Sequence, residues 1–233
     1  MINEIDEKIT YDNEVHKKIW PLAKSFREES SILIGGVYGS GKSVLLNTIL
    51  WSYLAFPDYY FFIDLRLVEL FNYKTHPNTR EYATDIQSSL KLLRNIISIM
   101  DSRVDEVIKE GKTKSDRPII HVVIDELFDV AIDKEFMLLL SQIIMRGRAA
   151  NIHVLMVTNN PTKQVIPDYN IASCGIALRC KTTTQSKNII GVPGAEKLPL
   201  FGQGLMYNKN GLQLIKIPMI DEEDIKLRVN HNV

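Results

Sequence analysis

The chain has 233 residues, of which 45% are hydrophobic and 24% charged, and its 28 Lys and Arg residues equal its 28 Asp and Glu residues. This balance is typical of one globular domain, and it excludes a disordered chain and a protein with a strong overall basic field. If DNA binds, it must be held by a local basic patch or by several smaller basic patches on different subunits. The polar start and the short apolar runs predict a cytoplasmic protein with no membrane span.

Residues 1–30 mix charged and apolar residues with weak helical periodicity, and we interpret them as an N-terminal arm. One domain, 31–233, follows, in which short apolar runs alternate with stretches of helical periodicity. The predicted strands are 31–35, 59–64, 119–125, 152–157, 175–180 and 212–217, and the predicted helices are 41–55, 84–110 and 134–150. This alternation predicts an α/β fold with a mostly parallel sheet flanked by helices.

Several chemically reactive side chains have a structural interpretation. Cys174 and Cys180 are expected on one face of a single strand as buried thiols, too far apart to bond to each other. His121 and His153 are expected to be packed or capping residues with structural roles, because they are isolated histidines without companion metal ligands. The aromatic run 59–62 could stack on bases, but its place in a buried strand favours core packing.

The strongest motif is residues 36–43, which read Gly-Val-Tyr-Gly-Ser-Gly-Lys-Ser between a predicted strand and a predicted helix. Such a loop cradles phosphates with backbone N–H groups and the helix N-terminus. Lys42 would reach the β- and γ-phosphates, and the Ser43 hydroxyl would bind Mg²⁺. The predicted nucleotide-binding residues are Gly36, Gly39, Ser40, Gly41, Lys42, Ser43 and Val44.

A second motif is the acidic pair at the end of the apolar strand 119–125. Asp125 would hold Mg²⁺ directly or through water, and Glu126 would orient and deprotonate the attacking water. Alone, such a pair often begins a loop or caps a helix. Beside a phosphate-binding loop it predicts hydrolysis, and the paired acid favours ATP over GTP.

Two further residues complete the predicted catalytic set. Asn159 follows the strand 152–157 and could sense the γ-phosphate. Arg148 precedes that strand and could act in catalysis, although a cation near a helix C-terminus is also favoured by the helix dipole alone.

Taken together, these motifs resemble the FtsK/SpoIIIE family of DNA translocases, whose motor has a RecA-like P-loop NTPase core. The resemblance runs from about Ser31 to Pro218. It is carried by Gly41-Lys42-Ser43, by the acidic pair, by residues 148–153 (Arg-Ala-Ala-Asn-Ile-His) and by residues 63–70. The most diagnostic segments are Gly-Ala-Glu-Lys-Leu at 194–198 and Gly-Gln-Gly-Leu-Met-Tyr at 202–207.

The resemblance implies a homo-hexameric ring that binds ATP and Mg²⁺ between subunits and threads double-stranded DNA through its pore. Arg148 matches an arginine that reaches the next subunit's ATP, and Lys187 falls where the family usually has arginine. Lys112, Lys114 and Lys163 are the candidate DNA contacts.

The sequence also departs from the family pattern. Thr-Asn-Asn-Pro at 158–161 replaces Thr-Gln-Arg-Pro, and the pore-facing stretch 162–170 is shorter. We expect no membrane-spanning N-terminus, no large domain before the motor and no winged helix after it. These expectations favour a stand-alone motor of a phage, plasmid or integrative element.

The leading hypothesis is therefore an ATP-hydrolysing DNA translocase whose partner is a relaxase, a portal or another mobile-element protein. A viral genome-packaging ATPase is the alternative of the same class. A nucleotide-dependent coupling or assembly factor that does not translocate DNA is the alternative of another class.

Overall fold

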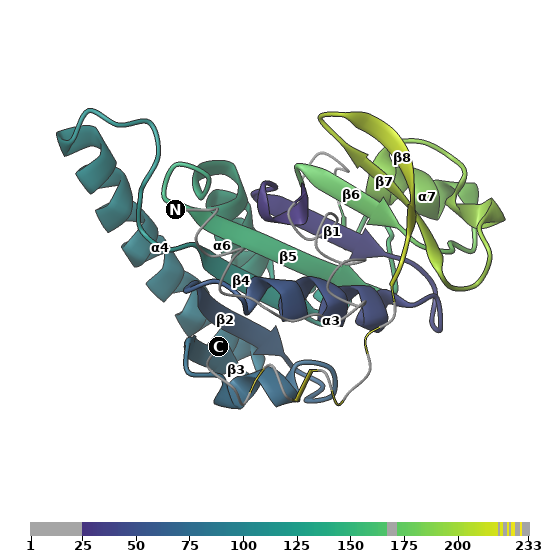
Figure 1. The fold of residues 1–233 in the computed structure, drawn as a ribbon, viewed down its shortest axis with the longest axis horizontal. Coiled ribbons are helices and arrows are strands. Elements are labelled where there is room, and N and C mark those ends of the chain that lie inside the picture. Colours follow the sequence, from purple (N-terminus) through teal and green to yellow (C-terminus); the bar gives the residue numbers. More distant parts are fainter. Residues whose placement is uncertain are drawn as a thin grey trace.

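The structure is a computed structural model that describes residues 25–166 and 172–218 and the single positions 220, 223, 225, 226 and 229. Within these residues an eight-stranded sheet has the order β3-β2-β4-β5-β1-β6-β7-β8 (Figure 1). Six neighbouring strands are parallel, and β7 and β8 join antiparallel at one end. The strands are β1 (Ser31–Gly35), β2 (Tyr59–Asp64), β3 (Thr79–Ala83), β4 (Ile120–Asp125), β5 (Ile152–Thr158), β6 (Cys174–Ala177), β7 (Gln203–Asn208) and β8 (Gly211–Lys216).

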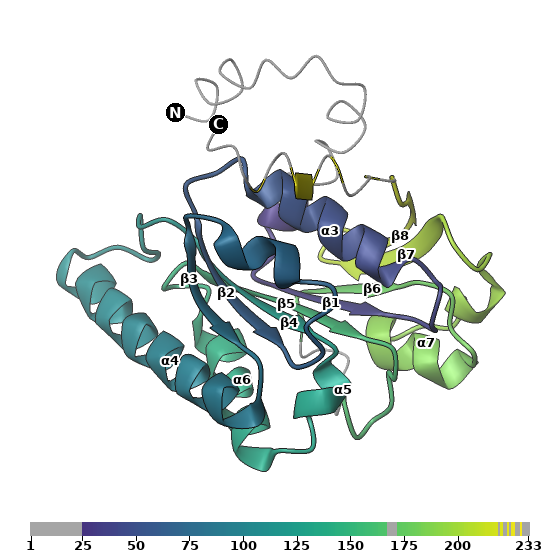
Figure 2. The same cartoon turned by 90° about the horizontal axis from the view of Figure 1, so that it is seen from below.

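Helices cover both faces of the sheet (Figure 2). One face carries α3 (Lys42–Tyr53) and the short 3-10 helix η1 (Phe71–Thr75), which pack on the odd-numbered apolar residues of β4 and β5. The other face carries α4, α5, α6, α7 and the 3-10 helix η3, which pack on the even-numbered residues. Both faces of a parallel sheet are normally buried in this way. The bounds on this second face are α4 (Ile86–Lys109), α5 (Leu127–Val130), α6 (Lys134–Arg146), α7 (Thr183–Ile190) and η3 (Ala195–Lys197).

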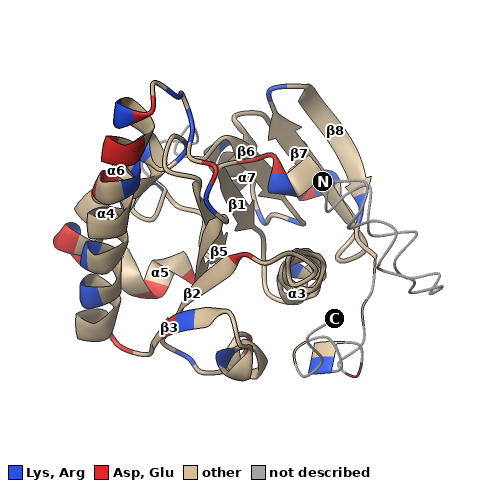
Figure 3. Ribbon diagram, turned by 60° about the vertical axis from the view of Figure 1, so that its left-hand side comes forward, with Lys and Arg blue, Asp and Glu red and all other residues tan. Residues whose placement is uncertain are grey.

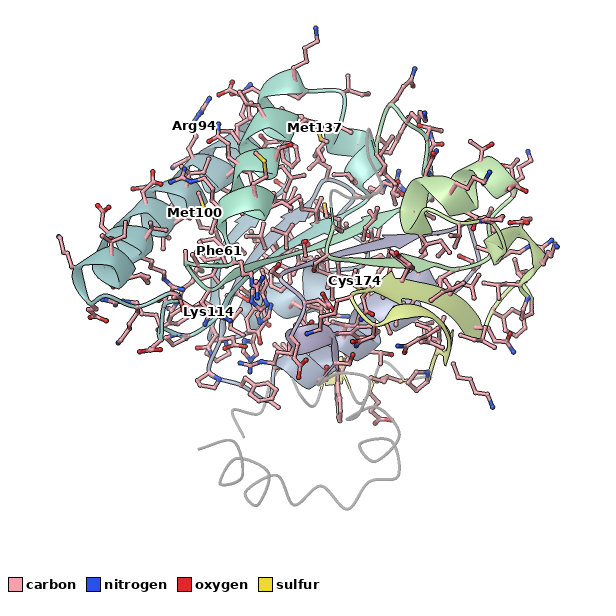
Figure 4. All side chains as sticks on the ribbon, turned by 90° about the horizontal axis from the view of Figure 1, so that it is seen from above. Phe61, Arg94, Met100, Lys114, Met137 and Cys174 are labelled. Atoms are coloured by element: carbon pink, nitrogen blue, oxygen red, sulfur yellow. The ribbon has the colours of Figure 1, made fainter. Side chains whose placement is uncertain are left out.

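The long helix α4 follows the predicted amphipathic stretch. Asp85 caps its N-terminus by accepting a hydrogen bond from the backbone N–H of Ser88 at 2.8 Å. Its apolar stripe includes Met100, which packs in the same core as Phe61 of β2; both are labelled in Figure 4. Its solvent side carries acidic and basic residues with no stripe of one sign (Figure 3). This helix therefore has a core-packing role.

The strand order decides where the functional residues meet. β1 lies between β5 and β6, and β5 separates β1 from β4. The parallel strands end at one edge of the sheet, so the segments after β1, β2, β4 and β5 converge there. Ligands bind at this carboxyl edge in open α/β sheets.

The predicted mostly parallel α/β sheet is confirmed, with three differences in detail. The helix predicted as 134–150 ends at Arg146, and Gly147, its C-cap residue, packs too closely to carry a side chain. A Cβ there would lie 2.5 Å from the Ile143 carbonyl oxygen. The strand predicted as 175–180 covers only residues 174–177. The sequence pattern also missed β3, β7, α5 and α7.

The expectation for the cysteines is wrong in its geometry. Cys174 lies in β6 and packs in the α3-side core, whereas Cys180 lies three residues beyond β6 and packs in the opposite core. The chain has left the strand by then, and the Cys180 N–H donates to the Ala195 carbonyl at 3.1 Å. Both thiols are buried and free, as expected.

The predicted structural roles of the aromatic and histidine residues are confirmed. Tyr60 and Phe62 are fully buried. His121 is 2% exposed and lies 3.0 Å from the Asp58 carboxylate, and its ring stacks on Tyr53. Most of the arm 1–30 lies outside the described residues. None of the described helices is both long and apolar enough to cross a bilayer.

Candidate nucleotide-binding and hydrolysis site

The glycine-rich loop 36–43 connects β1 to α3 at the carboxyl edge of the sheet. Its backbone is hydrogen-bonded to the end of β5 and to the segment after β6: the Gly36 N–H donates to the Thr158 carbonyl, and the Val37 N–H donates to the Arg179 carbonyl. Gly39 and Gly41 have φ values of 73° and 92°, in the left-handed region that favours glycine. The motif thus supplies glycine where the loop conformation requires it.

The two polar side chains that follow Gly41 already have defined partners. The Lys42 ammonium donates to the Val37 carbonyl at 2.9 Å. Burial lowers the pKa of Lys42, and the charges of Glu126, Asp125 and Glu69 oppose that shift. The Ser43 hydroxyl donates to the Glu69 carboxylate at 2.6 Å. Both side chains face the space beside the loop where a phosphate would lie.

The predicted acidic pair ends β4 in the same place. Asp125 is the last residue of β4, and its register partner at the end of β2 is Asp64. Burial raises the pKa of Asp125 to about 7, and the carboxylates of Asp64, Glu69 and Glu126 add to the shift. A carboxyl group with this pKa lies in an environment that favours the approach of a cation.

Glu126 is held in a fixed orientation. Its backbone is left-handed at φ 58°, which is unusual for a residue with a side chain. Its carboxylate accepts hydrogen bonds from the Thr158 hydroxyl at 2.9 Å and from the Asn159 N–H at 3.1 Å. Only 4% of the residue is exposed. The end of β5 therefore positions the proposed catalytic carboxylate.

These groups line one cavity of about 470 Å³. Its dimensions suit a drug-sized or nucleotide-sized ligand. Its glycines, Lys42 and the N-terminus of α3 suit phosphates, and its carboxylates suit hydrolysis. The lining residues are Tyr38, Gly39, Gly41, Lys42, Ser43, Val44, Arg66, Val68, Glu69, Asp125, Glu126, Val157 and Asn159.

The oxygen ligands in this cavity fit Mg²⁺. Ser43, Asp125 and Glu69 offer hydroxyl and carboxylate oxygens, the ligands that this hard cation prefers. Among the described residues, no group of three or more His, Cys, Asp or Glu side chains could hold a metal by itself. Mg²⁺ is usually bound by one or two protein groups together with phosphate oxygens and water, and Ser43 and Asp125 could supply such groups.

Sequence reasoning missed Arg66 and Glu69 as parts of the site, although both belong to the segment 63–70. Arg66 pairs with Asp129 through two hydrogen bonds and lies 3.7 Å from the Glu126 carboxylate. Asp64 organises the loop by accepting from the backbone N–H groups of Arg66, Leu67 and Leu70.

Arg148 lies outside this cavity. Together with Lys114 it lines a second cavity of about 640 Å³ near the amino-terminal ends of β4 and β5, at the opposite edge of the sheet. Partial burial and the charge of Arg148 lower the pKa of Lys114. No described lining residue is common to the two cavities. Thus Arg148 does not line the cavity that its own chain offers to a nucleotide.

The structure does not bring the three candidate DNA lysines together. Lys114, labelled in Figure 4, and Lys112 precede β4, whereas Lys163 follows β5 at the other edge of the sheet. Lys112 pairs with Glu110 and Asp116 at 2.7 and 2.6 Å. Lys163 is exposed, and so is Lys187 on α7.

With this geometry in place, comparisons with known proteins decide the family. The model of the FtsK/SpoIIIE family matches residues 3–167. The chain belongs to the FtsK/SpoIIIE family. It is 31% identical over 243 aligned positions to the DNA translocase FtsK of Staphylococcus aureus strain Mu50, covering 89% of this chain and 30% of that protein. Against FtsK of Leptospira interrogans serovar copenhageni the identity is 30%, covering 84% of this chain and 24% of that protein.

Several solved structures of ATPases share the fold of this chain. The pCW3 conjugation coupling protein TcpA with ATPγS superposes with a TM-score of 0.77 at 21% identity, covering 83% of this chain and 61% of that chain. The cytoplasmic domain of the Thermomonospora curvata type VII secretion ATPase EccC superposes with a TM-score of 0.71 at 21% identity. That superposition covers 87% of this chain and 28% of the EccC chain. The genome packaging NTPase B204 of Sulfolobus turreted icosahedral virus 2 superposes with a TM-score of 0.53 at 17% identity. That superposition covers 83% of this chain and 99% of the B204 chain. The chain is a P-loop ATPase domain of this family.

Proposed function

We propose that this chain is an ATP-driven motor that moves double-stranded DNA through a ring of identical subunits, in the service of a phage, plasmid or integrative element. One observation carries the proposal: a phosphate-binding loop and a firmly oriented glutamate share one cavity in a chain of the FtsK/SpoIIIE family. The matched relatives that are named DNA translocases support DNA as the substrate.

The residues of the cavity have distinct roles in hydrolysis. Gly39, Gly41 and Lys42 would bind the phosphates, after Lys42 leaves the Val37 carbonyl. Glu126 would orient the attacking water and accept its proton, because Thr158 and Asn159 fix the direction of its carboxylate. Ser43 and Asp125 would hold Mg²⁺, which when bound neutralises the charge that develops on the phosphates.

The position of Arg148 supports an assembly in which subunits complete each other's sites. The nucleotide cavity gathers the carboxylates of Glu69, Asp125 and Glu126, whereas the second cavity presents Arg148 and Lys114. A head-to-tail ring would place such unlike surfaces against each other. An arginine supplied by the neighbour would then stabilise the transition state, an effect worth orders of magnitude in rate.

Lys163 is the best placed of the candidate DNA contacts. It follows β5, whose last residue, Thr158, is hydrogen-bonded to Glu126. A structural change at the nucleotide could therefore reach this segment through Glu126 and Thr158. Lys112 is already paired with two carboxylates, and Lys114 lies beside Arg148. We therefore expect Lys163→Ala to weaken DNA binding more than Lys112→Ala.

An ATPase assay with and without duplex DNA, combined with a mass measurement of the assembly, tests the proposal. DNA should raise the turnover several-fold, and Lys42→Ala or Glu126→Gln should abolish it. Glu135→Gln is a suitable control, because this exposed residue pairs with Arg94 at the surface and does not line the nucleotide cavity. ATP turnover by the assembled protein that ignores every form of DNA would rule out a motor.

Two other settings are kept as candidates by the solved structures. Two of these proteins are a conjugation coupling protein and a genome packaging NTPase, so a role in conjugation and a role in genome packaging are both candidates. Dependence of the ATPase on a portal or on a relaxase would separate them. A coupling or assembly factor that does not move DNA would fail to displace a triplex-forming strand in the presence of ATP, whereas a translocase would displace it.

A further inference from the structure

Glu69 connects the loop after β2 to the phosphate-binding loop. Its carboxylate accepts the hydroxyl hydrogen of Ser43 at 2.6 Å, and it lines the nucleotide cavity. In a P-loop the Ser43 oxygen is the atom expected to bind Mg²⁺. Glu69 thus contacts the group expected to bind the metal directly.

The loop that carries Glu69 is built to hold it there. The buried Asp64 carboxylate accepts from the Leu67 N–H at 2.8 Å, the Leu70 N–H at 3.3 Å and the Tyr82 hydroxyl at 2.7 Å. Leu67 adopts a left-handed φ of 56°, a strained conformation that the surrounding bonds maintain. Leu70, next to Glu69, is fully buried. The position of Glu69 is therefore fixed by the fold.

The hydrogen bond determines which part of the Ser43 hydroxyl is available. A serine hydroxyl has one hydrogen and two lone pairs. A carboxylate can only accept, so Glu69 takes the hydrogen and leaves the lone pairs free for a cation. Hydrogen bonds of this kind orient metal ligands and raise their affinity for the metal.

Glu69 also changes the charge of the cavity. With Asp125 and Glu126 it places three carboxylates along the lining, against the two cations Lys42 and Arg66. Arg66 already pairs with Asp129. A divalent cation beside Ser43 would therefore gain from the charge of Glu69 as well as from its hydrogen bond.

We propose that Glu69 is a positioning residue for the metal that accompanies the nucleotide, acting through the Ser43 hydroxyl. This inference rests on nucleotide binding in the proposed function and not on DNA translocation. Its chemical consequence is specific: Glu69 contributes to the affinity for the metal–nucleotide complex and not to the affinity for metal-free nucleotide.

Calorimetric titration with ATPγS, in Mg²⁺ and in EDTA, tests this role. Glu69→Ala should lower the affinity gain that Mg²⁺ provides by about tenfold, the lower end of the usual effect of removing a partner of a metal ligand. The metal-free affinity should not fall, because the substitution removes a negative charge that faces the phosphates. Glu69→Gln keeps an acceptor oxygen without the charge, so it should lose less, about threefold.

A double-mutant cycle distinguishes positioning from a general structural effect. Ser43→Ala should lose the Mg²⁺-dependent gain, and adding Glu69→Ala to it should cost little more, because the two residues act as a unit. The exposed Glu135→Ala is the matched control. Additive losses, equal losses in Mg²⁺ and EDTA, or an unchanged Mg²⁺ gain would each overturn the inference. Because the assay uses neither DNA nor turnover, a chain that fails to translocate DNA would still give the expected result.

Discussion

The Thr158 hydroxyl donates a hydrogen bond to the Glu126 carboxylate across 2.9 Å. Thr158 is the last residue of β5 and is fully buried, and Glu126 follows the last residue of the neighbouring strand β4. The oxygen of Thr158 in turn accepts from the Asn160 N–H at 3.1 Å. A single hydroxyl therefore links the proposed catalytic carboxylate to the segment that leads toward Lys163.

Thr158→Val should lower the ATPase turnover with little change in the KM for ATP. Valine has nearly the same shape as threonine, but it cannot donate to Glu126. Loss of one partner of a buried polar pair costs about 1–3 kcal/mol, so we expect kcat to fall about tenfold. Steady-state kinetics over a range of ATP concentrations measures both parameters.

Thr158→Ser is the matched control, because it keeps the hydroxyl and should retain most of the activity. An equal loss in the serine and valine variants would assign the effect to packing. A large rise in KM with unchanged kcat would contradict the positioning of Glu126.

The parts of the site that the sequence predicted are those with a fixed local pattern. The loop 36–43 has its glycines and lysine at set spacings between a strand and a helix, so the geometry follows from the motif. Asp125 ends and Glu126 follows a mostly apolar strand, which places them at the carboxyl edge of the sheet. Asn159 was predicted by the same reasoning.

Glu69, Arg66 and Thr158 could not be assigned roles from the sequence, because their functions depend on tertiary contacts. Glu69 lies in a loop without periodicity, and tertiary contacts, among them the hydrogen bonds to Asp64, hold that loop against Ser43. The hydroxyl of Thr158 matters only because β5 lies beside β4. The sequence pattern misses β3 and β7 because polar residues interrupt both strands, so neither shows a continuous apolar run.

Asp125→Asn should stabilise the metal-free chain at pH 8. The pKa of Asp125 is raised to about 7 in the folded chain, above its ordinary value of 3.8. The folded state thus binds the proton more tightly than the unfolded state, and stability falls as the pH rises from about 4 to about 7. Removing the charge should raise the Tm at pH 8 by on the order of 2–4 °C.

Thermal unfolding in EDTA, followed by circular dichroism, measures this effect. The same variant should differ little from the wild type at pH 4, where Asp125 is protonated in the folded state. A lower Tm at pH 8 would contradict the proposed electrostatic strain.

His153 should make the chain sensitive to acid. Burial, with the nearby His121, lowers the pKa of His153 to about 3 from an ordinary value of 6.5. The unfolded state therefore binds the proton more tightly, and stability is lost as the pH falls from about 6.5 toward 3. At pH 5 the expected loss from this residue is about 2 kcal/mol relative to pH 8.

His153→Phe should remove that part of the acid sensitivity. The His153 side chain is 6% exposed, and its Nδ1 atom has no hydrogen-bond partner among the described residues, so a ring without nitrogen should be tolerated. The fall in Tm between pH 8 and pH 5 should be smaller in the variant by about 4 °C. An unchanged fall would show that other groups cause the acid sensitivity.

Mixing two inactive variants tests whether Arg148 acts on the neighbouring subunit's nucleotide. Arg148→Ala and Glu126→Gln should each lack DNA-stimulated ATPase activity. If Arg148 acts in trans, a mixed ring contains interfaces at which an intact Arg148 faces an intact Glu126. Random mixing of equal amounts makes about a quarter of the interfaces intact, so up to about a quarter of the wild-type rate should return.

The control for this mixing experiment combines Lys42→Ala with Glu126→Gln. Lys42 and Glu126 line the same cavity of one chain, so every subunit in this mixture carries a substitution in its own nucleotide site. No interface regains an intact site, and no activity should return. Mass measurement must confirm that mixed rings form in both experiments. Arg148 does not line the nucleotide cavity of its own chain, which is the reason for expecting a role in trans. An inactive mixture of Arg148→Ala and Glu126→Gln in verified mixed rings would contradict that role.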